Sequence, residues 1–207
     1  MESRSNSMAT VRSYLAESAE IQRLTGDACA EAIATAAEVI TDAFRSGGKL
    51  LICGNGGSAA DSQHMAAEFV SRLTRDFERP GLPAIALTTD TSFLTAYAND
   101  CGFEGVFARQ VQALGRPGDV LVGISTSGNS QNVIQAVEVA RASGMRTVSL
   151  TGSRGRLAKL ADVAVTVPSD DTQHIQESHL AIEHLLCLLV ERAIFGRSQT
   201  AETGVRR

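Results

Sequence analysis

A histidine and a glutamate four residues apart, His64 and Glu68, share one face of a predicted helix. Imidazole and carboxylate groups in this arrangement can ligate a metal ion or move protons. The helix follows a glycine-rich turn at residues 54–58, whose backbone amides and helix dipole favour an anion. The pattern indicates a functional site, and the alternative is a tight strand-to-helix turn before a solvated helix face.

A second polar turn, S-T-S-G-N-S at residues 125–130, also lies between an apolar strand and a helix. Its hydroxyls, together with free amides at a helix start, suit a phosphate monoester without a lysine. The alternative is helix capping by Ser127 or Ser130. Neither turn matches the patterns G-x-x-x-x-G-K-[ST] or G-x-G-x-x-G, so a dinucleotide is disfavoured.

Three of the four histidines lie within residues 174–184, near the start of the last predicted helix. His184 could join a metal cluster there, together with the nearby amide and carboxylate side chains. His174 and His179 could equally be structural. The spacing alone does not choose among them.

The elements that must position these residues are short apolar strands alternating with helices. This order predicts a parallel sheet covered on both faces, with ligands bound beyond the carboxyl ends of the strands. The predicted strands lie near residues 50–53, 84–87, 119–124, 147–150 and 163–167. The predicted helices between and after them lie near residues 59–73, 92–98, 104–114, 131–142, 157–160 and 172–194.

The chain before the first strand is predicted to be helical. One helix is expected at residues 10–21, and a second is expected to begin at Asp27 as its N-cap and to end at Gly47 and Gly48. We therefore expect a helical extension at residues 1–46 and the sheet domain at residues 47–207, with a long C-terminal helix. The second half of that helix is apolar almost all round, so it should be buried in the core or against another subunit.

The composition excludes several classes of protein. The 207 residues are 43% hydrophobic, with a net charge of −4 and 4% aromatic residues, which disfavours a nucleic-acid surface. The four cysteines are widely spaced and are expected to be free thiols in a reducing cytoplasm. No signal peptide and no membrane span are expected, and the predicted location is cytoplasmic.

Five segments together resemble the sugar-isomerase (SIS) domain family, and most closely its phosphoheptose isomerases. The segments follow one another in order between residues 47 and 195 and read CGNGGSAADSQHMAAEFVSR, LTTDTSFLTAYAND, GDVLVGISTSGNSQNVI, LTGSRGRLA and VPSDDTQHIQESHLAIEHLL. The resemblance implies a three-layer αβα, flavodoxin-like fold with a five-stranded parallel sheet. It also implies a homotetramer with active sites at subunit contacts and one zinc ion per subunit.

The resemblance also assigns roles to individual residues. Its implied zinc ligands are His64, Glu68, Gln176 and His184, and its acid/base pair is Glu68 and His184. Its implied sugar-phosphate contacts include Glu68 and Gln176, and Ser58 is a further candidate. The remaining contacts are Asn55, Gly56, Gly57, Asn99, Asp100, Ser125, Thr126, Ser127 and Ser130.

One geometric question stays open at this point. On a straight helix, Gln176 and His184 lie about 12 Å apart along the axis. They can share one ion if it sits between them. Otherwise, Gln176 lies where the helix is only beginning, or the two residues come from different subunits.

The implied reaction interconverts D-sedoheptulose 7-phosphate and D-glycero-D-manno-heptose 7-phosphate through an enediol. Two other functions compete with it. One is a non-catalytic SIS protein that senses sugar phosphates or binds a DNA-replication initiator; relatives with that adaptor role lack the residues retained here at Glu68 and His184. The other is an isomerase of a different sugar phosphate.

Overall fold

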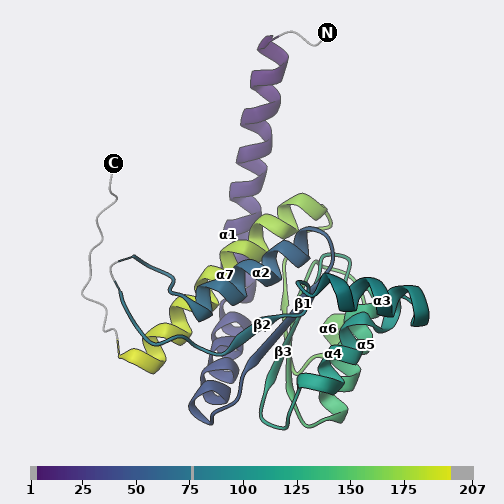
Figure 1. The fold of residues 1–207 in the computed structure, drawn as a ribbon. Helices are drawn as coiled ribbons and strands as arrows, with labels where there is room; N and C mark the ends of the chain where they lie inside the picture. The colour runs from purple at the N-terminus through teal and green to yellow at the C-terminus, as the bar shows by residue number, and fades with distance from the viewer. Residues whose placement is uncertain (1–3, 76, 197–207) are drawn as a thin grey trace.

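The computed structural model describes residues 4–75 and 77–196, and its centre is one parallel sheet (Figure 1). The strand order is β2-β1-β3-β4-β5, as in flavodoxin-like folds. Leu50 pairs with Ala84 on one side and with Val120 on the other. The prediction of a five-stranded parallel α/β sheet is confirmed. The strands are β1 (Leu50–Gly54), β2 (Ala84–Ala86), β3 (Val120–Ser125), β4 (Arg146–Thr151) and β5 (Val163–Thr166).

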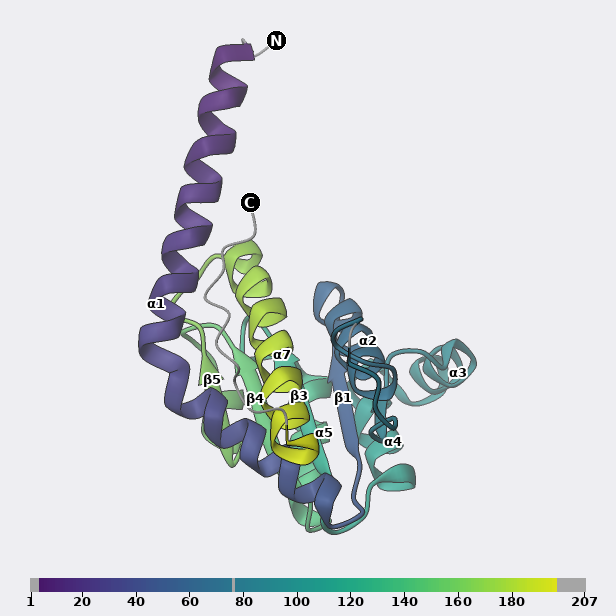
Figure 2. The ribbon, with the colours of Figure 1, turned by 90° about the vertical axis from the view of Figure 1, so that its left-hand side faces the viewer.

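Helices cover both faces of the sheet because the side chains of each strand alternate between two apolar cores. Leu50 and Ile52 of β1 pack in the core beneath α1 (Arg4–Arg45), α2 (Gly57–Val70) and α7 (Thr172–Phe195). Leu51 and Cys53 point the other way. The helices on their side are α3 (Thr91–Cys101), α4 (Val106–Leu114), α5 (Gln131–Ala142) and α6 (Leu157–Leu160). The two helical layers lie on opposite sides of the strands in Figure 1, and in Figure 2 the layer of α1, α2 and α7 faces the viewer.

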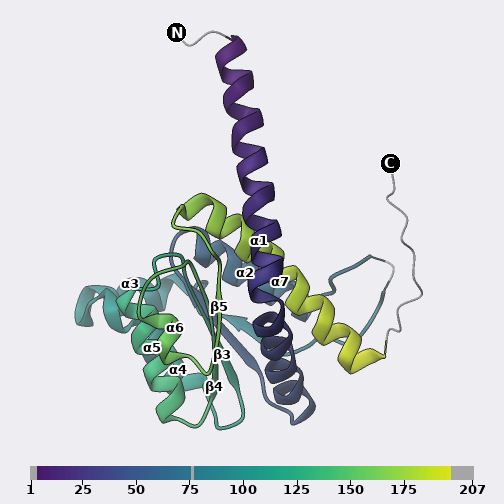
Figure 3. The same cartoon turned by 180° about the vertical axis from the view of Figure 1, so that it is seen from behind.

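The N-terminal region is one continuous helix, so the prediction that Asp27 caps a second helix is wrong. Asp27 lies inside α1, where its carboxylate pairs with Arg23 one turn earlier. Gly26 does not break the helix, because the apolar stripe that begins at Cys29 packs on the sheet and continues the helix without interruption. The 42 residues of α1 span about 63 Å, and their first half projects beyond the body of the molecule (Figure 3).

A buried ion pair joins α2 to α7. Arg79, in the segment after α2, donates to Glu191 of α7 at 2.6 Å, and the two side chains are only 1% and 2% exposed. The same guanidinium donates to the main-chain oxygens of Glu68 and Phe69, both at 2.8 Å. These carbonyls lie in the last turn of α2, where helical partners are lacking. Arg79 therefore caps the C-terminal carbonyls of α2 and links this end of the helix to α7.

Two further expectations about the chain can be compared with the structure. All four cysteines are free thiols, as predicted; Cys29, Cys53 and Cys187 are buried, and Cys101 is exposed. Among the helices of the described residues, none has the length and apolar character needed to cross a bilayer.

Replacing Glu191 with Ala is expected to lower the free energy of unfolding by about 3–5 kcal/mol, because the Arg79 charge would stay buried without its partner. Glu191→Gln, which can still accept a hydrogen bond, is expected to cost less. Urea unfolding at fixed protein concentration measures both changes, with Glu78→Ala as an exposed control. A Glu191→Ala protein as stable as the control would contradict this assignment.

Candidate functional site

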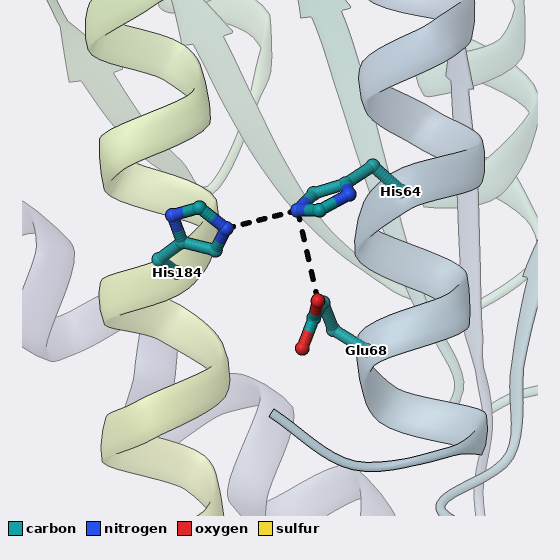
Figure 4. Close-up of side chains that lie close together, drawn as sticks. All are labelled: His64, Glu68 and His184. Carbon is teal, nitrogen blue, oxygen red and sulfur yellow. Dashed lines mark hydrogen bonds and ion pairs between the residues drawn. The ribbon is translucent and has the colours of Figure 1, made fainter. Parts of the chain in front are cut away.

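Two histidines and a glutamate meet where α2 and α7 lie side by side (Figure 4). His64 and Glu68 extend from successive turns of α2, and His184 extends from α7. The two Nε2 atoms are 2.9 Å apart, and His64 Nε2 lies 3.8 Å from Glu68 Oε1. One ligand atom from each of the three residues lies within 4.8 Å of the others. The structure therefore brings together three of the four predicted metal ligands.

The donor set of this cluster fits a divalent cation. Two imidazole nitrogens and a carboxylate are ligands that zinc commonly takes in proteins. Glu68 Oε2 is buried and has no hydrogen-bond partner among the described residues, so this carboxylate retains unused capacity. The His64 and Glu68 side chains are 40% and 19% exposed, which leaves the cluster open to a ligand.

The second polar group lies at the carboxyl ends of β1 and β3. The Ser125 hydroxyl is 3.0 Å from that of Ser130 and 3.4 Å from that of Ser127. Asn55 of the glycine-rich turn and Asn132 of α5 exchange two side-chain hydrogen bonds, both of 2.8 Å. The two polar turns that the sequence singled out are thus tied together. We call residues 125–130 the hydroxyl cradle.

Gln176 lies at the glycine-rich turn. Its side-chain amide occupies the space beside Gly57 where a Cβ atom would stand, so glycine at this position lets the amide approach the turn closely. Gly56 has a φ of 58°, a conformation that glycine adopts readily. Ser58 is buried in the first turn of α2. Seven residues separate Gly57 from His64, or about 10 Å along α2, so the role of Gln176 as a fourth metal ligand stays a prediction.

The predicted substrate contacts Asn99 and Asp100 lie on α3, near the outer end of the molecule (Figure 1). Both are exposed, and the Asn99 side chain donates to the Asp100 carboxylate at 2.8 Å. α3 contains no buried residue within the described chain. The described contacts do not join this pair to either polar group.

Glu183, one of the carboxylates that the sequence placed beside His184 in the last helix, is buried, which the sequence did not indicate. It is fully buried beside His184, and neither carboxylate oxygen has a hydrogen-bond partner within residues 4–75 and 77–196. Burial, reinforced by the negative charge of Asp61, raises the pKa of Glu183 to about 9. The side chain is therefore neutral at pH 7. The polar residues around it in the sequence do not indicate burial, because burial depends on how α7 packs against the other elements.

The other two histidines of α7 have structural contacts. His179 is fully buried, and its Nε2 lies 3.3 Å from the main-chain oxygen of Thr151. Burial lowers its pKa to about 4. His174 lies against the Tyr14 ring, with its Nδ1 atom 3.3 Å from Glu177. Neither belongs to the metal-ligand cluster, which agrees with the structural alternative for both.

A sheet with this strand order, carrying polar turns at its carboxyl edge, defines a doubly wound α/β domain with a ligand site at that edge, and comparison with known proteins gives its family. The model of the SIS domain matches residues 13–152. The chain belongs to the SIS domain family.

Within this family the chain is similar to phosphoheptose isomerases. The chain is 58% identical over 179 residues to a phosphoheptose isomerase from Roseiflexus sp., covering 86% of this chain and 90% of the relative. The solved phosphoheptose isomerase of Neisseria gonorrhoeae superposes with a TM-score of 0.84 at 45% identity, covering 89% of this chain and 98% of that one. That of Francisella tularensis has a TM-score of 0.86 at 40% identity, with coverage of 90% and 98%. The chain groups with these enzymes and is a sugar-phosphate isomerase.

The buried His179 predicts how stability depends on pH. Its pKa falls from 6.5 in the unfolded chain to about 4 in the folded protein, so the unfolded state binds more protons between these values. Stability is therefore expected to fall as the pH drops from 6.5 toward 4. His179→Gln should lose less stability than the wild type between pH 7.5 and pH 5, by about 2 kcal/mol. Urea unfolding at both pH values tests this, and equal losses in the two proteins would contradict it.

Proposed function

We propose that this protein interconverts D-sedoheptulose 7-phosphate and D-glycero-D-manno-heptose 7-phosphate. The observation that carries the proposal is the meeting of Glu68 with His64 and His184 at one point between α2 and α7. A carboxylate and imidazoles are the groups needed to move protons between two adjacent carbons and their oxygens.

The spacing of the two polar groups supports a substrate with distant functional ends. The hydroxyl cradle and the glycine-rich turn lie at the start of α2, and His64 lies about 10 Å further along this helix. In a heptose 7-phosphate, the phosphate sits on C7, whereas the reacting carbons are C1 and C2. A seven-carbon chain held by its phosphate at the cradle can extend its other end toward Glu68.

Glu68 is proposed to remove the proton from C1 of the ketose, which leaves an enediol, and to return a proton to C2. His184 moves the hydroxyl proton between O1 and O2, so the aldose carries the same atoms as the ketose. Glu68 Oε1 faces His64, while Oε2 is the buried oxygen without a partner among the described residues. Metal binding lowers the basicity of a carboxylate, so either Glu68 holds the ion loosely or His184 does more of the carbon chemistry.

A zinc ion is part of the proposal, with His64, Glu68 and His184 as its ligands and Gln176 as the predicted fourth. When bound, zinc supplies a Lewis acid that polarises the substrate carbonyl. The chain's own residues orient the sugar and transfer its protons.

Assembly into a homotetramer is also proposed. Met8, Val11 and Leu15 are 48%, 57% and 62% exposed along the projecting half of α1. Their helical spacing forms an exposed apolar stripe. Nothing in the described chain covers this stripe, which favours a second copy of the chain as its partner. The exposed Asn99 and Asp100 would then lie where another subunit can use them. The four free thiols support a cytoplasmic location.

Replacing Glu68 with Gln is expected to lower kcat by about 10²–10⁴-fold, because the amide cannot accept the carbon-bound proton. The affinity for inorganic phosphate should be nearly unchanged, since the cradle keeps its hydroxyls. NMR detection of the aldose formed from sedoheptulose 7-phosphate measures the first effect, and phosphate titration measures the second. Near-normal turnover would remove Glu68 from the mechanism.

The metal proposal can be tested without measuring activity. After treatment with a chelator, the wild-type protein is expected to bind Co²⁺ and show visible absorption from a site with nitrogen and oxygen ligands. His184→Gln should bind Co²⁺ at least tenfold more weakly, whereas Gln63→Ala, an exposed change on α2 beside His64, should bind normally. Equal Co²⁺ affinity in all three proteins would contradict the assignment of this cluster.

A further inference from the structure

A cavity of about 260 Å³ lies beside the hydroxyl cradle, on the side away from the glycine-rich turn. Thr126, Ser127 and Asn129 of the cradle form one wall. The loop that follows β4 forms a second wall with Ser153 and Arg154. The segment before α7 closes the cavity with Ser169, Asp170 and Thr172. The proposed phosphate site therefore continues into a cavity lined mostly by polar residues, with Ile175 as its apolar member.

The loop after β4 is packed directly against the cradle. Gly128 has a φ of 62°, and the carbonyl oxygen of Arg154 occupies the space where a Cβ atom of residue 128 would stand. The main-chain amide of Arg156 donates to the Asn129 side chain at 3.3 Å. The backbone at position 154 is thus held against the cradle.

Arg154 is the one cationic residue among those that line the described cavity. Its guanidinium donates to the carboxylate of Asp170, which also accepts a hydrogen bond from Ser153. The two side chains of the ion pair are 78% and 50% exposed. Exposed ion pairs contribute little to stability, so this arginine can change its partner at small cost. A phosphate dianion in the cradle carries more charge than the carboxylate and can accept two parallel bonds from a guanidinium.

We infer that Arg154 is a specificity residue for the phosphate end of the substrate, which transfers from Asp170 to the phosphate group when the cradle is filled. The inference rests on the proposed function for the identity of the sugar, but concerns only the recognition of its phosphate. In this scheme Asp170 orients Arg154 in the absence of phosphate. It also opposes phosphate binding, because it competes for the same guanidinium and its negative charge repels the incoming anion.

The test compares four full-length proteins by isothermal titration with inorganic phosphate. Arg154→Gln is expected to weaken phosphate binding about tenfold, since one charge-assisted contact is lost. Asp170→Asn is expected to tighten binding about threefold, because the competing negative charge is removed. Arg156→Gln is the matched control: it lies on the same loop, but its guanidinium pairs with Glu138 at 3.2 Å, and its phosphate affinity should change less than twofold.

The opposite effects of the two substitutions on phosphate affinity distinguish phosphate recognition by Arg154 from a purely structural role of the ion pair. If the Arg154–Asp170 pair only held the loop in place, both substitutions would weaken phosphate binding, and that result would overturn the inference. An unchanged affinity in Arg154→Gln, or no saturable phosphate binding by the wild type, would also overturn it.

Turnover gives the second measurement. With sedoheptulose 7-phosphate, Arg154→Gln should raise KM in the same proportion and leave kcat within about twofold, because the reacting carbons lie at the far end of the sugar. A separate outcome is that the phosphate affinities of the variants change as expected while the wild type does not convert sedoheptulose 7-phosphate. In that case the proposed function fails and the role of Arg154 stands.

Discussion

The arrangement of the site depends on how α2 and α7 are fixed against each other, and the buried contact of Arg79 with Glu191 sets that register. The guanidinium reaches the carbonyl of Glu68 as well as the carboxylate of Glu191. Glu191 lies two turns beyond His184 on α7, and Glu68 is itself a member of the cluster. A slip of one residue between the helices would turn His184 by about 100° away from His64. The ion pair thus holds together the two helices that carry the candidate catalytic groups.

The second constraint is the parallel sheet, which delivers the polar turns to one edge. Because β1 and β3 are neighbours in register, the glycine-rich turn and the hydroxyl cradle emerge side by side, and Asn55 and Asn132 then bond across them. Glycine at position 57 leaves space for Gln176 from α7. In the proposed function, α2 therefore starts at the phosphate end of the site and carries the proton-transfer groups two turns later, so that phosphate recognition and proton transfer are separated along a single helix.

The sequence predicted the sheet and most helices because apolar periodicity and glycine punctuation are local signals that agree with the fold. Asp27 shows where local signals fail. An aspartate before an apolar stripe resembles an N-cap, but α1 packs on the sheet and continues as one helix past this residue. His64, Glu68 and His184 were suggested by type and spacing, and their roles by resemblance. The neutral Glu183 and the position of Arg154 beside the cradle depend on tertiary packing, which no spacing in the sequence reveals.

The two ends of the proposed site differ in how they can change. The cradle is built from turns, and its cation, Arg154, is exposed and bound to a partner that it can leave. The histidine and glutamate cluster is built from two helices locked by a buried ion pair, so its members cannot move independently. The distance between the ends is set by the residues of α2 between Gly57 and His64. Selection of sugar length is then a property of that helix: an added or deleted turn would move His64 by about 5 Å relative to the cradle. Tolerance of different phosphate positions would instead arise in the loop after β4.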